Sequence, residues 1–351
     1  MVCAGENHSP AHFHGGIIMK SALRKLVQIV AACAISGATL AAAHAATQDT
    51  ERLQQAWRTA ISHKPVPGQG CFNASYPLLI WHQVRCAKPA KSQLSQLQRT
   101  PVSAPAGGSD DYMAVTKSLT SKAVASFPLV RHVTSEYGAY GPNDYTLLIS
   151  TNSNLNTPAC AGSSTPTYCV GWEQFAFLNL NREAFIQYWM LFYNATCPTG
   201  WNAGPTGSCW RNSRIVRVPR QALTELPYLS LSATAVLRGL DTLVMTTRTQ
   251  AYSTSGSDAV ALARGWHGTE FNVVGTSCST CDPAAYFNAG ASLTVKVAVT
   301  DGNAQKPTCA ANAGTAVETN NLVLGPCTAV PGKGGADPYI KFTETAPTAP
   351  K

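Results

Sequence analysis

The sequence predicts an all-β fold: an antiparallel two-sheet sandwich of the jelly-roll or concanavalin-like kind, preceded by a small helical, cysteine-bounded module. From residue 110 onward, strand-length runs rich in Val, Thr, Leu and aromatic residues alternate with clusters of Gly, Asn, Pro and Ser. No amphipathic helix pattern of ten or more residues separates these runs, which disfavours βαβ units. No repeat period is visible either, and this argues against a propeller or a solenoid.

The first 45 residues predict an export signal outside the fold. A basic start at Met19 to Lys25 leads into an apolar stretch that ends at the cleavage pattern Ala43-His44-Ala45. A membrane anchor is the alternative, but the stretch is rich in alanine and contains Ser, Gly and Thr. Residues 1–18 precede the basic start, and a start codon assigned upstream of the true one explains them. We expect a secreted or periplasmic protein, compatible with a bacterial host, with no membrane span after cleavage.

Ten cysteines remain after signal removal, and an even number in an exported chain indicates disulfides. In sequence order they form five neighbouring couples, although spacing alone leaves the connectivity open: Cys71 and Cys86, Cys160 and Cys169, Cys197 and Cys209, Cys278 and Cys281, Cys309 and Cys327. The C-x-x-C at 278–281 could be redox-active or half of a zinc site. No helix pattern and no second half-site accompany it, so we expect a structural clasp and no metal.

Residues 46–109 differ from the rest and form an N-terminal module with a linker. Apolar residues at helical spacing predict a helix over 48–61, which the Pro-containing turn at 63–68 ends. A short unit bounded by Cys71 and Cys86 follows, and residues 88–108 have the Pro, Ser and Gln content of an exposed linker. We expect either a removable propeptide or an appendage. Residues 110–351 then form the sandwich domain with a C-terminal tail.

Seven strands of the sandwich follow from period-two patterns, at 145–150, 173–178, 185–193, 229–237, 242–247, 269–274 and 293–299. The second and third are joined by Asn179-Leu-Asn-Arg182 and predict a hairpin. A two-residue loop sets Trp172 opposite Trp189 and Gln174 opposite Gln187. A four-residue loop would set Gln174 against Trp189 instead.

In either register the two glutamines share a face with Trp172, Trp189 and Phe185, because alternate residues of a strand point the same way. A buried amide without a hydrogen-bond partner costs ~1–3 kcal/mol of stability, and two facing amides can provide partners by bonding each other. The face is therefore either a Trp/Gln binding groove for a glycan, peptide or surface partner, or a glutamine ladder that is buried in the core or beneath the N-terminal module.

The strand pattern from Gly138 to Val299 resembles the glutamic peptidases, secreted β-sandwich enzymes of the eqolisin type. Gln174 in WEQF matches the family's glutamine, Gln187 in FIQYWM falls near the family's glutamate, and Glu270 lies in the later strand GWHGTEFNVVG. The resemblance implies an acid endopeptidase in which a Gln and a Glu hold the attacking water. An amide cannot accept a proton from water, so Gln187 departs from that pattern.

Glu173 has the wrong parity to replace the missing carboxylate, which leaves Glu270 as the catalytic acid on a strand. The resemblance then implies that Glu270 activates water and that the Gln174 amide stabilises the oxyanion. In this interpretation residues 46–109 are a removable propeptide that covers the cleft.

The charge distribution and the absence of known motifs disfavour nucleic-acid-binding proteins and several classes of enzyme. The formal charge is +8, but the arginines are scattered apart from Arg211, Arg214, Arg217 and Arg220, and no aromatic interleaving indicates nucleic acid. No G-x-S-x-G, H-E-x-x-H or Walker sequence is present, and no cofactor is expected. The sequence therefore favours a secreted binding protein, with the acid endopeptidase as the alternative and a structural surface protein as a third option.

Overall fold

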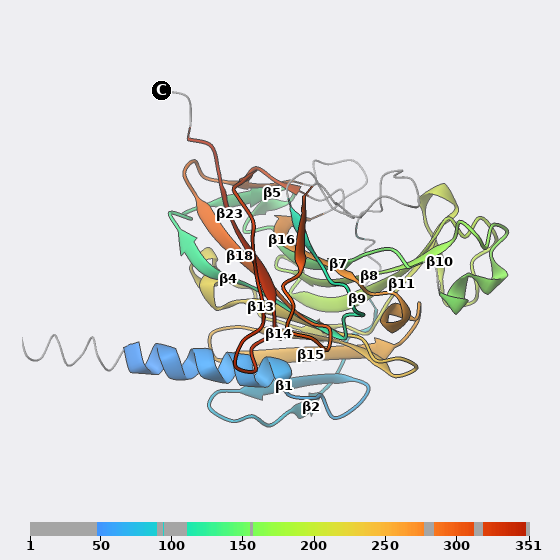
Figure 1. Cartoon of the computed structure of the whole chain (residues 1–351), viewed down its shortest axis with the longest axis horizontal. Coiled ribbons are helices and arrows are strands. Elements are labelled where there is room, and N and C mark those ends of the chain that lie inside the picture. The colour runs from blue at the N-terminus through green and yellow to red at the C-terminus, as the bar shows by residue number, and fades with distance from the viewer. Residues whose placement is uncertain are drawn as a thin grey trace, which may run out of the picture. The chain divides into compact units, whose positions relative to one another are not determined.

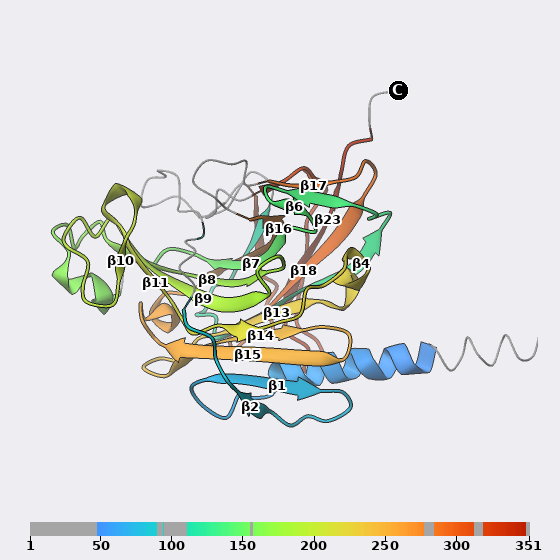
Figure 2. The same cartoon turned by 180° about the vertical axis from the view of Figure 1, so that it is seen from behind.

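The computed structural model describes residues 48–89, 94, 111–154, 157–276, 284–311 and 319–348 (Figures 1 and 2). The predicted export signal, most of the predicted linker, and Cys278 and Cys281 lie outside these residues. The chain divides into two compact units, 1–53 and 54–351, and the sandwich belongs to the second. A helix over 48–63 confirms the predicted N-terminal helix.

The larger sheet has ten strands, and all its pairings are antiparallel. In spatial order they are β2 (His82–Val84), β1 (Cys71–Ser75), β15 (Gln250–Ser257), β14 (Leu240–Thr246), β13 (Ser230–Thr234), β4 (Lys122–Arg131), β18 (Ser292–Thr300), β23 (Tyr339–Thr345) and β21 (Val323–Leu324), with β22 (Thr328–Val330) also paired to β23.

The second sheet has nine strands and is also antiparallel. Its order is β10 (Asn202–Ala203), β11 (Cys209–Asn212), β9 (Glu183–Leu191), β8 (Val170–Leu178), β7 (Tyr145–Thr151), β16 (Gly268–Gly275), β3 (Tyr112–Val115) and β19 (Thr308–Ala311), with β12 (Val216–Arg217) also paired to β9. The predicted fold class is confirmed, and the seven predicted strands correspond to β7, β8, β9, β13, β14, β16 and β18.

Short elements complete the described chain. A small sheet contains β20 (Thr319–Asn320), β17 (Ala284–Phe287), β5 (Glu136–Gly138) and β6 (Gly141–Pro142). Four 3-10 helices are η1 (Pro158–Gly162), η2 (Pro205–Gly207), η3 (Leu223–Tyr228) and η4 (Leu262–Arg264).

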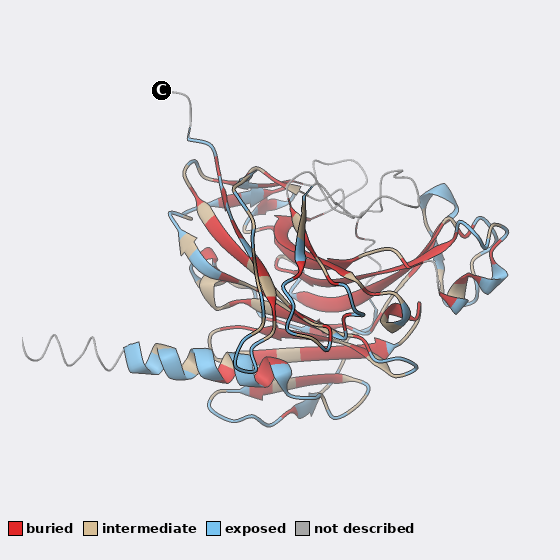
Figure 3. Cartoon of the chain, in the orientation of Figure 1, coloured by how far each residue is buried: buried red, intermediate tan, exposed pale blue. Residues whose placement is uncertain are grey.

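The main core lies between the two large sheets and is built from the inward residues of each strand (Figure 3). Phe127 of β4 meets Phe271 of β16 with ring centroids 5.1 Å apart, which joins the two layers. On β8 and β9 the inward residues include Phe175, Ile186 and Tyr188, all in this core. The intervening residues of these two strands therefore face away from the ten-stranded sheet, on what we call the outer face.

Both ends of the chain contribute to the larger sheet. In the N-terminal region, β1 pairs with β15 from Cys71↔Thr254 to Ser75↔Gln250, and Trp57 and Ile61 of the helix pack in a satellite core with Phe72. Residues 71–75 thus extend the sandwich instead of standing apart from it. At the other end, β23 lies between β18 and β21, where the sequence indicated only a tail.

Four disulfides join cysteines of the described residues, and they confirm four of the five predicted sequential pairs. They join Cys71 to Cys86, Cys160 to Cys169, Cys197 to Cys209 and Cys309 to Cys327. Such bonds form in oxidising compartments. Within the described ranges, no helix is long and apolar enough to cross a membrane.

Candidate active site on the outer face

The β8–β9 hairpin has the tighter of the two predicted registers. Gln174 lies opposite Gln187, Trp172 opposite Trp189 and Ala176 opposite Phe185. The turn closes with the Arg182 amide donating to the Asn179 carbonyl at 3.3 Å, which leaves a two-residue loop. The turn chemistry and side-chain parity together place both glutamines on the outer face.

Strand pairing extends this hairpin pattern into three rows that cross the outer face. The tryptophan row consists of Trp210, Trp189 and Trp172. The polar row runs over five strands and consists of Asn212, Gln187, Gln174, Ser150 and Glu270. The apolar row consists of Phe185, Ala176 and Leu148, with Ile215 packed against them.

Gln174 and Glu270, the two predicted catalytic residues, therefore lie in one row, with Ser150 between them. Their backbones are two strand spacings apart, about 10 Å. Side chains of this length that lean toward each other can both reach one water molecule. Glu173, in contrast, faces the ten-stranded sheet, as its parity predicted, and pairs with Tyr188.

Gln187 has hydrogen-bond partners on both sides of its amide. Its Oε1 accepts from Trp189 Nε1 at 3.0 Å and from the Leu94 backbone amide at 3.1 Å, and its Nε2 donates to Asn212 Oδ1 at 2.7 Å. The side chain is fully buried. Gln187 is therefore held in place by its neighbours, in a manner suited to positioning.

Gln174 is also fully buried, yet neither Oε1 nor Nε2 has a hydrogen-bond partner among the described residues. The two facing amides do not bond each other, because Gln187 is turned toward Asn212 and Trp189 instead. Leaving a buried amide unpaired costs ~1–3 kcal/mol, and such groups concentrate at functional sites.

Glu270 is buried at the other end of the polar row, beside Asp111. Burial, and then the charges of Glu270 and Glu344, raise the pKa of Asp111 well above its ordinary range, and the Asp111 and Glu270 carboxyl groups hydrogen-bond each other. Asn272 donates from Nδ2 to Asp111 Oδ1 and, at 3.0 Å, to Glu344 Oε2. Two carboxyl groups this close cannot both ionise readily, so the pair retains a proton.

Leu94, from the predicted linker, lies on the apolar row. Its side chain is buried among Leu148, Phe185 and Val274, and its backbone amide is bonded to Gln187. Earlier in the chain, Ala87 forms a β-bridge with Ile215 at the margin of the same face. A main-chain segment of the N-terminal region thus contacts both the polar and the apolar rows.

The predicted binding residues Trp172 and Trp189 are brought together but fully buried. Their ring centroids are 6.1 Å apart, and Trp210 continues the row at 6.3 Å from Trp189. Trp172 Nε1 donates to the Thr151 carbonyl at 2.9 Å. Gly204 lies against Trp189 and Trp210, so the region of η2 covers this end of the face.

A second cluster of carboxylates, which the sequence did not predict, lies on the inward side of the same sheet. One oxygen each from Glu173, Asp241 and Asp258 lie within 4.8 Å of one another. Burial, and then the charge of Asp258, raise the pKa of Asp241 to about 8, and burial followed by Asp241 raises that of Glu173.

The fold and the described disulfides define a disulfide-stabilised antiparallel β-sandwich protein that carries a buried Gln/Glu row on one sheet. No family model, no curated protein and no solved structure matches the chain.

Proposed function

We propose that the protein is an exported acid endopeptidase of the glutamic type, in which Glu270 is the general base and Gln174 stabilises the oxyanion. The observation that carries the proposal is the buried, unpartnered amide of Gln174 in one row with the carboxyl group of Glu270. An unpaired buried amide costs the folded protein ~1–3 kcal/mol. This cost is expected of a preorganised donor that gains its hydrogen-bond partner only when substrate binds.

Hydrolysis on this row balances with the residues present. Glu270, as carboxylate, takes a proton from water while the water oxygen attacks the peptide carbonyl carbon. The Gln174 N–H groups donate to the oxygen that gains negative charge. When the C–N bond breaks, Glu270 returns its proton to the leaving amine, so that one water is consumed and two peptides are released.

The Asp111 and Glu270 pair suits acidic conditions. The raised pKa of Asp111 keeps a proton on Asp111, which donates a hydrogen bond to the neighbouring carboxylate. The proton on Asp111 thereby gives the Glu270 carboxylate a hydrogen-bond donor.

The contact of Leu94 supports a peptide as the ligand of this face. A backbone N–H donates to Gln187 Oε1, and the attached apolar side chain enters the row of Leu148 and Phe185. An extended substrate would present the same two features, a main-chain donor and an apolar side chain. Leu94 then occupies the position of a substrate residue and covers part of the site.

The second candidate is a secreted binding protein that holds a glycan, peptide or surface partner on the same face. The fully bonded Gln187 and the adjacent tryptophan row favour it, because both are features of rigid binding surfaces. It differs from the peptidase in one respect, since binding alone does not require the Glu270 carboxylate.

The test is incubation of the mature chain, beginning at Ala46, with denatured protein near the ordinary pKa of glutamate, about 4.3. We expect cleavage by the parent and a loss of at least about 100-fold in Glu270→Gln and Gln174→Ala. Glu183→Gln is the matched control, because Glu183 also lies on this sheet but bonds Arg217. Absence of cleavage together with binding on a glycan or peptide array would favour the binding protein.

A further inference from the structure

The cluster of Glu173, Asp241 and Asp258 joins the two large sheets. Glu173 belongs to β8 of the nine-stranded sheet, Asp241 to β14 of the ten-stranded sheet, and Asp258 follows β15 directly. Glu173 and Asp241 are completely buried, whereas Asp258 is partly exposed. An acidic group of the nine-stranded sheet thus meets two from the β14–β15 hairpin of the other sheet.

Few hydrogen bonds offset the burial of these carboxyl groups. Glu173 and Asp241 hydrogen-bond each other and the Ala259 amide faces Asp241, whereas Oδ1 of Asp258 makes no hydrogen bond within the described part of the chain. Asp258 Oδ2 accepts from the Arg238 amide at 2.9 Å. No described lysine or arginine forms an ion pair with any of the three. A cation bound between these groups would supply the charge compensation that the described residues do not.

Tyr188 supplies an independent indication of a ligand. Its side chain is 2% exposed, and its hydroxyl has no hydrogen-bond partner among the described residues. Tyr188 lies directly opposite Glu173, and its hydroxyl lies so close to Gly256 that a Cβ at that position would collide with it. Gly256 in turn pairs with Asp241. The unpartnered phenol is therefore aimed at the gap between Glu173 and Asp241.

We propose that Glu173, Asp241 and Asp258 bind a divalent metal cation between the two sheets, with the Tyr188 hydroxyl beside it. An all-oxygen donor set favours hard cations, and Ca²⁺ suits it best because it accepts carboxylates, neutral oxygens and water in flexible geometry. Three carboxylates with a divalent ion leave one negative charge. Arg211, whose charge acts on Glu173, balances that remainder.

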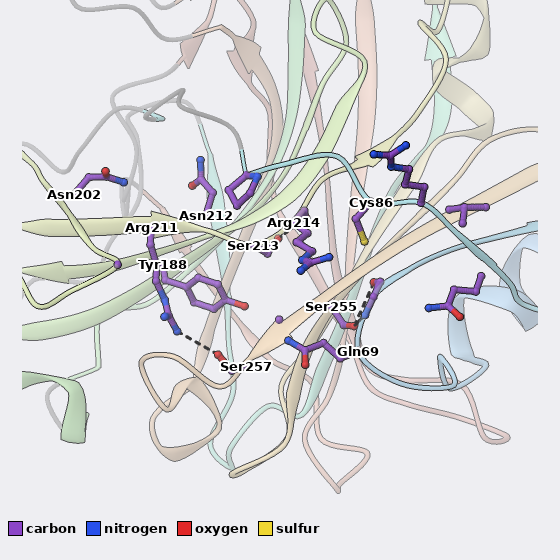
Figure 4. Close-up of a pocket in the computed structure, with 17 residues that line it drawn as sticks. Gln69, Cys86, Tyr188, Asn202, Arg211, Asn212, Ser213, Arg214, Ser255 and Ser257 are labelled. Atoms are coloured by element: carbon purple, nitrogen blue, oxygen red, sulfur yellow. Dashed lines mark hydrogen bonds between the residues drawn. The ribbon is translucent and has the colours of Figure 1, made fainter.

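A polar pocket of about 840 Å³ lies next to the cluster (Figure 4). Tyr188, Gly256 and Ser257 line it, so the pocket wall includes the residues adjacent to Glu173, Asp241 and Asp258. In Figure 4 the Tyr188 ring points into the pocket from β9, and Arg211 bonds Ser257 at 3.2 Å. The pocket therefore reaches residues that neighbour the cluster, and Asp258 is itself partly exposed.

The test uses the mature chain, stripped with a chelator at neutral pH and titrated with Ca²⁺, Mg²⁺ or Mn²⁺ separately. We expect Ca²⁺ at a hundred times its dissociation constant to raise the unfolding midpoint by about 5 °C. Asp241→Asn and Glu173→Gln should abolish that shift. Asp301→Asn, which removes another largely buried carboxylate, should retain it.

Terbium luminescence gives a second readout that requires little more than a folded protein. Tb³⁺, a Ca²⁺ substitute, should show emission sensitised by the adjacent aromatic rings in the parent and in Asp301→Asn, and at least tenfold less in Asp241→Asn. The proposal is overturned if none of the three cations shifts the midpoint, or if Asp241→Asn binds terbium as the parent does. The site is independent of the peptidase chemistry, so either can fail alone.

Discussion

Replacing Gln174 with methionine should make the protein more stable and inactive at once. The Gln174 amide is fully buried and has no hydrogen-bond partner in the described residues, so the folded state carries a desolvation cost of ~1–3 kcal/mol. Methionine has a similar length and volume, and it fills the same space without polar atoms. The predicted gain is therefore about 1–3 kcal/mol, or roughly 2–6 °C in the unfolding midpoint.

The matched variant is Gln187→Met on the neighbouring strand. Gln187 is equally buried, but it accepts from Trp189 Nε1 and the Leu94 amide and donates to Asn212. Its replacement leaves these groups unpaired and should lower stability by about 2–4 kcal/mol. Thermal unfolding of the two variants beside the parent measures the contrast, and the acid cleavage assay should show a loss of about 10²–10³-fold for Gln174→Met.

The reasoning would be refuted if Gln174→Met were destabilised as much as Gln187→Met. That outcome would mean that Gln174 is bonded in solution and serves the fold. If Gln174→Met were stabilised but still cleaved substrate at the parent rate, the desolvation cost of Gln174 would be confirmed and its role in catalysis would be excluded.

Three further predictions follow from other parts of the molecule. Burial and the charge of Asp144 raise the pKa of Glu136 from 4.5 to about 8. The stabilisation by this group is therefore complete below pH 4.5 and is lost as the pH rises through 8. The unfolding midpoint should fall over that range, and it should fall less in Glu136→Gln. Leu94→Asp places a charge in the apolar row, and the chain that retains residues 46–109 should then cleave substrate faster than the parent does. Non-reduced peptide maps should join Cys278 to Cys281; a link from either one to another cysteine would contradict local pairing.

Much of the fold was predictable because most buried strands alternate or form apolar runs of strand length. The missed strands have identifiable reasons. β4 contains Pro128, which lies where the pairing with β18 shifts register between Thr294 and Lys296, and prolines in sheets occur at such irregularities. β15 is rich in Ser and Thr, which are buried here through bonds such as Ser253 Oγ to the Leu243 carbonyl. Such polar strands resemble loops in sequence.

The site was predictable only as far as local rules reach. Turn length and parity give the Gln174 and Gln187 pair, because both residues lie on one hairpin. The bonding of Gln187 to Asn212 and Leu94, and the proximity of Asp111 to Glu270, depend on strand order across 25 to more than 150 residues of sequence. Periodicity along single strands contains no information on such pairings. The same reason explains why the cluster containing Asp241 was not predicted.

The most direct test of the peptidase proposal is the initial rate at which the mature chain cleaves denatured protein at acidic pH, compared with that of Glu270→Gln. Both proteins should unfold at similar temperatures, so the comparison isolates the carboxylate. The proposal predicts peptide products from the parent and a rate at least about 100-fold lower from the variant. Equal rates in the two proteins, or no cleavage by correctly folded parent and Leu94→Asp chains, would contradict it.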